Sequence, residues 1–74
     1  MSQPTNKIED YRKKYPKGTR LRLTKRIKDP YTSKEVGDIL TVDYIDDAGQ
    51  IHGAWKSGGS IAIIIGLDNF EVVS

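Results

Sequence analysis

The sequence of 74 residues contains no cysteine and a single histidine, His52. Without cysteine the chain has neither a disulfide nor a thiolate metal ligand, so its stability depends on the packing of one core. A catalytic set of nucleophile, base and orienting group would need serine, lysine and carboxylates, and no spacing in the chain is typical of one. We therefore expect no enzyme, no cofactor and no small-molecule substrate.

Long apolar segments are also missing. The longest run, Ile61–Ile65, is far shorter than the roughly 20 residues that a membrane-spanning helix needs, and the polar N-terminus has no apolar stretch typical of a signal peptide. We expect a cytoplasmic protein without a membrane partner, in keeping with the absence of cysteine.

Two motifs with a superficial likeness to ligand sites are better explained as turns. The acidic stretch 43–49 lacks the alternating acids and the distal glutamate of a calcium loop. The glycine-rich stretch 56–60 lacks the Gly-Lys-Ser/Thr ending and the following helix of a phosphate-binding loop. We expect no metal site.

Charge is present but unevenly distributed. Residues 1–28 hold ten Lys and Arg against two acids, a net charge of +8, whereas residues 29–74 hold two Lys against eight acids, a net charge of −6. A basic segment of this density is typical of a surface that contacts a polyanion. The alternative is that these cations solubilise the protein or pair with the acids of the second half. Nine of them fall within seventeen positions: Arg12, Lys13, Lys14, Lys17, Arg20, Arg22, Lys25, Arg26 and Lys28.

Apolar spacing predicts a helix over residues 6–15, after a flexible tail at 1–5. Ile8, Tyr11 and Tyr15 fall on one face of it, Asn6 with Glu9 is typical of a helix cap, and Pro16 ends the helix. Residues 16–74 form the remainder of the same single domain.

From Thr19 onward the apolar period changes to two, which predicts strands. Leu21 and Leu23 mark the first, and further strands are expected at 38–45, 50–56, 60–65 and 71–73, separated by a loop and tight turns. The apolar residues of 38–45 do not alternate cleanly, which predicts a β-bulge. Five short antiparallel strands indicate a mainly β domain that closes into a small SH3-like barrel with a short N-terminal α-helix.

The run Ile61–Ile65 is strongly β-forming and uncharged, so it must be protected from aggregation. If alternate isoleucines fill the barrel, Ile64 faces outward. We expect Ile8 and Tyr11 of the helix to cover it and leave a monomer. The alternative is a homodimer contact through Ile64.

A set of motifs carries a family resemblance: Tyr15-Pro16-x-Gly18-Thr19-Arg20-Leu21, Asp29-Pro30-Tyr31-Thr32, Val36-Gly37, Asp46-Asp47-Ala48-Gly49-Gln50-Ile51-His52, Trp55-x-x-Gly58 and Phe70-Glu71-Val72-Val73. Together they resemble an uncharacterised family of small domains, mostly of low-GC Gram-positive bacteria, their phages and other mobile elements. The resemblance implies an SH3-like barrel of unknown function and transfers no active site. Tryptophan followed by a glycine turn also resembles Tudor-like and KOW-like barrels, which bind peptides or nucleic acids.

We therefore expect a non-catalytic binding module of a phage or mobile element that contacts nucleic acid through the nine cations of a basic helix–strand face. Tyr31, Tyr44 and Trp55 are the expected aromatic partner contacts. The alternative is a protein–protein module that engages or inhibits a host protein, with the same aromatics as hot spots. For Trp55 the alternative to partner contact is a place in the core. His52 is expected on the opposite, solvent-facing side of the same strand.

Overall fold

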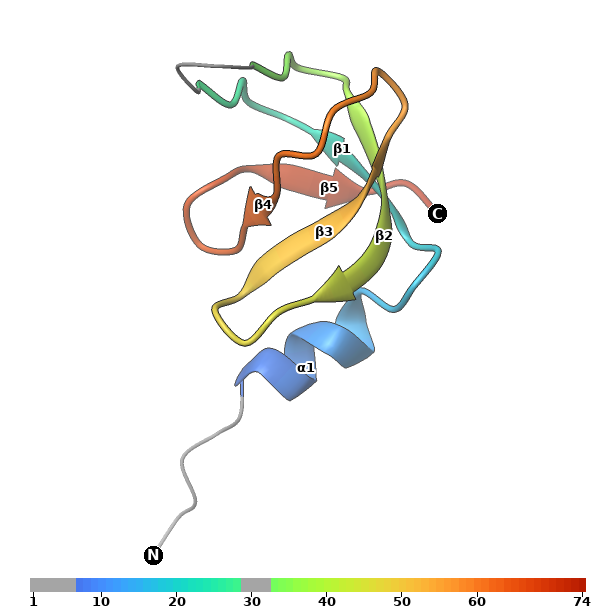
Figure 1. Ribbon diagram of the computed structural model, residues 1–74, viewed down its shortest axis with the longest axis vertical. Coiled ribbons are helices and arrows are strands. Elements are labelled where there is room, and N and C mark those ends of the chain that lie inside the picture. The colour runs from blue at the N-terminus through green and yellow to red at the C-terminus, as the bar shows by residue number, and fades with distance from the viewer. Residues whose placement is uncertain (1–6, 29–32) are drawn as a thin grey trace, which may run out of the picture.

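The computed structural model describes residues 7–28 and 33–74, and its first element is helix α1, Lys7–Lys14 (Figure 1). The helix ends because Pro16 offers no N–H and Gly18 adopts φ +93°, a conformation that side-chain-bearing residues rarely take. The N–H of Gly18 donates to the carbonyl of Val42 at 2.8 Å, which ties the turn to the sheet. The helix lies where the sequence predicts it, whereas Asn6 and the tail 1–5 are outside the described residues.

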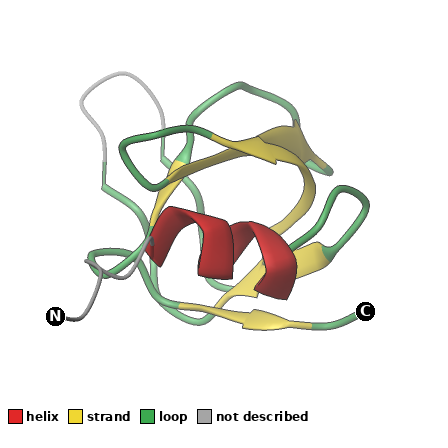
Figure 2. Ribbon diagram, turned by 90° about the horizontal axis from the view of Figure 1, so that it is seen from below, coloured by secondary structure: helices red, strands yellow, loops and turns green. Residues whose placement is uncertain are grey.

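Five antiparallel strands follow and form one sheet in the order β4-β3-β2-β1-β5. Their bounds are β1 Arg20–Leu23, β2 Ile39–Ile45, β3 Gln50–Trp55, β4 Ile63–Ile64 and β5 Phe70–Val72. The sheet curls around the core, and Figure 2 shows α1 crossing the opening at one end of it. The mainly β class with five antiparallel strands and a short helix is therefore confirmed.

The sheet is not closed into a barrel, because β4 and β5 are its two edges and do not pair. Strand β4 is short since Ile64 turns its backbone toward its own chain: its N–H donates to Asp68 Oδ2 at 2.8 Å, and its carbonyl accepts from Leu67 and Asp68. The groups that would bond to β5 are thus already satisfied. The predicted strand 60–65 is accordingly reduced to two residues.

The predicted β-bulge is present in β2. Val42 pairs with Gly53 of β3 and Tyr44 with His52, so Asp43 is the extra residue. The bulge brings the Thr41 carbonyl oxygen to the place that a Cβ at residue 53 would occupy, which explains the glycine there. After the bulge Ile45 points inward and Tyr44 outward, so the strand changes direction without losing its buried face.

The core is made of ten buried side chains. Eight come from strands β1 to β4, and two, Tyr15 and Ile27, lie before and after β1. The full set is Tyr15, Leu21, Leu23, Ile27, Leu40, Val42, Ile45, Ile51, Trp55 and Ile63. Ile8 and Tyr11 pack against this core, and Ile8 lies near Gly49 in the turn between β2 and β3. The expectation that these two residues cover Ile64 is wrong: α1 packs against β2, and Ile64 lines a hollow on a different part of the sheet.

Candidate nucleic-acid interface

The side of the sheet that points away from the core, here called the outer face, is built from alternating residues of β1, β2 and β3. Residues paired across antiparallel strands project to the same side, so Arg20 stands beside Thr41, and Thr41 beside Ala54. Arg22 pairs with Ile39 in the next row. Arg20 and Arg22 are both exposed, while Leu21 and Leu23, which alternate with them, are buried, as the sequence predicts.

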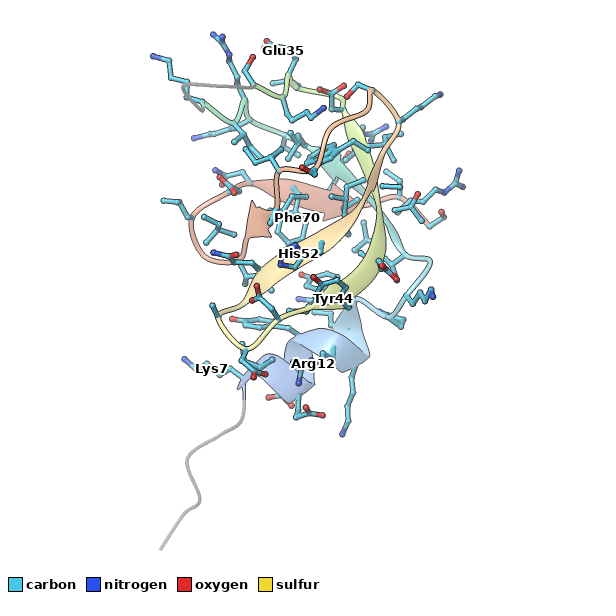
Figure 3. All side chains as sticks on the ribbon, viewed as in Figure 1. Lys7, Arg12, Glu35, Tyr44, His52 and Phe70 are labelled. Carbon is cyan, nitrogen blue, oxygen red and sulfur yellow. The ribbon has the colours of Figure 1, made fainter. Side chains whose placement is uncertain are left out.

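An exposed aromatic pair marks one end of the outer face. The Tyr44 ring, in a residue 54% exposed, stacks on the His52 ring with centroids 4.6 Å apart and an interplanar angle of 14° (Figure 3). A 2.8 Å hydrogen bond joins Nε2 of His52 to Oδ2 of Asp46 and holds the imidazole in place. The imidazole therefore supports a tyrosine ring that is more than half exposed to solvent.

A shallow hollow of about 510 Å³ lies on the outer face. Small residues leave this space: Thr41, Gly53, Ala54 and Ser60 line it, together with Lys17, Val42, Asp43 and His52. Lys17 and Asp43 face each other across a 3.5 Å ion pair. The outer face thus combines a hollow lined by small residues, cations from β1 and the turn before it, and the stacked rings of Tyr44 and His52, here called the aromatic platform.

The nine cations of the predicted basic face do not form one surface. Four pair with acids of the second half of the chain: Arg12 with Asp47, Lys17 with Asp43, Arg22 with Glu71 and Arg26 with Glu35. Arg12 also donates to the Ile45 carbonyl and binds Glu9, which attaches α1 to the β2–β3 turn. The alternative weighed from the sequence, pairing with the acids, thus applies to part of the set.

The other five cations have no acidic partner among the described residues, and four of them lie at the two ends of the molecule. Lys13 and Lys14 belong to α1, at the lower end in Figure 1, whereas Lys25 and Lys28 follow β1 at the upper end. The fifth, Arg20, begins β1 beside Thr41 and donates to Ser74 Oγ at 2.6 Å, a neutral partner that leaves its charge uncompensated. The cations on the helix and those on the strand are therefore separate surfaces.

The other expected aromatic contacts are not on the outer face. Trp55 is only 5% exposed and donates its indole N–H to the Ile61 carbonyl at 2.7 Å, so it has the core role that competed with partner contact. Tyr31 lies outside the described residues. Tyr44 alone of the three is seen as an exposed ring.

Among the residues that the structure describes, one cation is buried, and the sequence pattern gave it no role beyond the polar loop in which it lies. Lys34 is 5% exposed, its Nζ donates to Ser57 Oγ and to the Gly58 carbonyl, and the ammonium lies 5.2 Å from the Trp55 ring centroid. It joins the long loop after β1 to the turn after β3. A lysine in a polar loop offers no sequence signal for burial, because only the tertiary fold brings Trp55 beside it.

We expect Lys34→Ala to lower the free energy of unfolding by about 1–3 kcal/mol, since the Gly58 carbonyl and Ser57 lose their donor and Trp55 loses a packing partner. Urea denaturation of the variant measures this. Val36→Ala, at an exposed position of the same loop, is the matched control and should change stability little. Equal stability of the two variants would contradict a linking role for Lys34.

The hydrogen bonds of Asp46 lead us to expect that the protein loses stability in acid. The hydrogen bond with His52, followed by the backbone N–H groups of Gln50 and Ala48, lowers the pKa of Asp46 below its usual value. A carboxylate with a lowered pKa in the fold stabilises it above the unfolded value of about 3.9, and this contribution is lost as the pH falls through the folded value. Urea denaturation between about pH 2 and 6 should show the wild type losing its advantage over Asp46→Asn below about pH 4. A difference in stability between the wild type and Asp46→Asn that did not change with pH would contradict this expectation.

Comparisons with known proteins identify the family and no individual relative. The family model described as "Domain of unknown function (DUF4314)" matches residues 4–73. No curated protein and no solved structure matches the sequence. Within residues 7–28 and 33–74, no helix is long and apolar enough to span a bilayer, and no three histidine or acidic side chains gather as metal ligands would.

Proposed function

Since the chain belongs to the DUF4314 family of domains of unknown function, we propose its function from its own surface: it is a binding module that contacts single-stranded nucleic acid through the outer face of its sheet. The observation that carries this proposal is the Tyr44 ring, stacked on His52 and open to solvent, on the face that also presents Arg20 and Arg22. An unpaired base stacks on such a ring, and cations nearby neutralise the phosphates.

Single strands suit this face better than a duplex. A stacking platform needs a base that is not already stacked in a helix, and stacking tolerates any sequence because every base has a π-face. Tyr44 lies three residues along β2 from Thr41, the neighbour of Arg20, or roughly 10 Å at the rise of a strand. A base on Tyr44 therefore places the adjoining backbone over the small residues of the hollow and toward Arg20.

The proposal narrows the predicted basic face to its strand portion. Lys17 lines the hollow together with His52, and Arg20 and Arg22 are exposed on the neighbouring strand β1. Lys17 and Arg22 each keep one exposed acidic partner, whereas Arg12 is bound to the β2–β3 turn through Asp47 and the Ile45 carbonyl. We also propose that the fold is an SH3-like barrel left open between β4 and β5. The strand order β4-β3-β2-β1-β5, in which β5 returns to pair with β1, is the order that such an opened barrel would have.

Substitution of Asp43 tests the proposal through an expected gain of affinity. Its carboxylate lies in the hollow and pairs with Lys17, so it repels phosphates and occupies a cation that could bind them. We expect Asp43→Asn to tighten binding of a fluorescent oligothymidine about threefold at low salt, as measured by fluorescence anisotropy.

The control for this test is Asp47→Asn, which removes an acid that pairs with Arg12 at α1 instead. It removes the same charge from the protein and should change affinity less. Equal tightening in both variants would indicate a response to net charge alone, and no binding by the wild type at low salt would refute the proposal.

A further inference from the structure

One ion pair of the outer face lies where a nucleotide bound to that face would meet it. Nζ of Lys17 is 3.5 Å from Oδ1 of Asp43, and both residues line the hollow of the outer face. His52 lines the same hollow and stacks on Tyr44, so the hollow adjoins the aromatic platform. A single strand that stacks one base on the platform therefore has its next nucleotide over the hollow and beside the ion pair.

The backbone places the two members of this pair. The N–H of Gly18 donates to the Val42 carbonyl at 2.8 Å, which ties the residue after Lys17 to the residue before Asp43. The β-bulge then leaves Asp43 and Tyr44 exposed in succession, whereas a regular strand would turn one of the two toward the core. The fold itself thus sets an acid directly beside the aromatic platform.

An acid at this place weakens the attraction of phosphates, and its ion pair contributes little to the stability of the fold. The side chains of Lys17 and Asp43 are 81% and 58% exposed, and ion pairs between exposed side chains are weak. Oδ2 of Asp43 has no partner among the residues that the structure describes. The carboxylate is therefore able to accept hydrogen bonds from a ligand in the hollow.

Together the two side chains present one hydrogen-bond donor and two acceptors. The Lys17 ammonium only donates, and both oxygens of the Asp43 carboxylate only accept. The Watson–Crick edge of guanine is the complement of this set, because its O6 accepts while its N1–H and N2 amino group donate. Thymine would place its O2, an acceptor, against a carboxylate oxygen, and adenine and cytosine each offer a single donor group. Among the four bases, guanine alone uses all three protein groups.

We propose that the ion pair of Lys17 and Asp43 recognises guanine in a single strand, an inference that rests on the proposed function and gives it a base preference. Asp43 accepts from N1–H and the N2 amino group, and Lys17 donates to O6. The base lies over Gly53 and Ala54, the small residues that leave the hollow open. Stacking on Tyr44 supplies affinity for any base, and the ion pair favours one of them at the neighbouring position.

Fluorescence anisotropy at low salt tests the inference with an oligothymidine and with the same oligothymidine carrying one central guanine. The wild type should bind the guanine oligonucleotide about tenfold more tightly, as expected for one good bidentate contact to a base. Inosine in place of guanine lacks only the N2 amino group and should lose most of this gain. An oligonucleotide with 7-deazaguanine keeps the Watson–Crick edge and should retain it.

Asp43→Asn should reduce the preference for guanine to less than about twofold, although it tightens the binding of oligothymidine itself. The variant should fold, because the Asp43 side chain is exposed and pairs with an exposed lysine. Asp47→Asn removes the same charge beside α1 and is the matched control, so it should keep the tenfold preference of the wild type.

The possible failures of the inference and of the proposed function are distinct. Equal affinity of the wild type for the two oligonucleotides would overturn guanine recognition and leave single-strand binding in place. A guanine preference that persists in Asp43→Asn would assign the recognition to other residues and overturn the role of the ion pair. Absence of binding to either oligonucleotide at low salt would refute the proposed function and guanine recognition together.

Discussion

Replacing Gly53 with alanine should lower the free energy of unfolding by about 3 kcal/mol, a large share of the roughly 4–11 kcal/mol expected for a chain of this length. The bulge at Asp43 places the Thr41 carbonyl oxygen where the new Cβ would lie, with the Thr41 carbonyl carbon 2.9 Å and the Asp43 nitrogen 3.1 Å away. These are backbone atoms in the middle of the sheet, so they cannot move aside as a side chain would. Urea denaturation followed by circular dichroism measures the loss.

Gly66→Ala is the matched control. Gly66 has φ +92°, but no atom lies within 4 Å of the position that a methyl group would take, so its substitution carries only the strain of the left-handed conformation, about 1 kcal/mol. If Gly53→Ala were no less stable than Gly66→Ala, the bulge would be able to relax, and the pairing of Val42 with Gly53 would not be a fixed feature of the sheet.

Replacing Tyr44 with alanine should weaken binding of oligothymidine by about 2 kcal/mol, or roughly thirtyfold, while the fold persists. The ring is exposed and contacts His52 by stacking, so its removal takes away the platform and little of the core. Tyr44→Trp keeps a stacking surface and should retain affinity. Fluorescence anisotropy at low salt compares the variants.

Val72→Ala controls for the loss of an exposed side chain. Val72 is exposed to a similar extent, 51%, but it lies on edge strand β5 away from the aromatic pair. Its substitution should leave oligothymidine binding unchanged. A Tyr44→Ala variant that binds as tightly as Val72→Ala would show that the aromatic platform contributes nothing and that charge attraction alone holds the strand.

The elements that the sequence predicts well are those whose pattern is local. The alternation of Leu21 and Leu23 with Arg20 and Arg22 indicates a strand with one buried face, and the broken alternation in 38–45 indicates the bulge that is found. Helix α1 is predicted because its apolar residues recur at the helical period and Pro16 stops it. Each signal lies within a few residues of chain.

The features that the sequence does not reveal depend on residues far apart in the chain. Nothing in the pattern of 60–65 says that Asp68 will cap Ile64 and shorten β4, which leaves the sheet open. The predicted basic face is too large because the acids that neutralise it come from the second half, as in the pairing of Arg22 with Glu71. Tyr44 is identified from its residue type alone, and its stacking on His52 follows from the register across the bulge.

The most direct test of nucleic-acid binding by the outer face is a nuclear magnetic resonance titration of the ¹⁵N-labelled protein with oligothymidine at two ionic strengths. We expect shifts of the backbone amides on the outer face, at Arg20, Thr41, Tyr44, His52 and Ala54, that shrink as salt rises because phosphate contacts release counterions. Absence of shifts at low salt, or shifts confined to Lys13 and Lys14 of α1, would contradict the proposal.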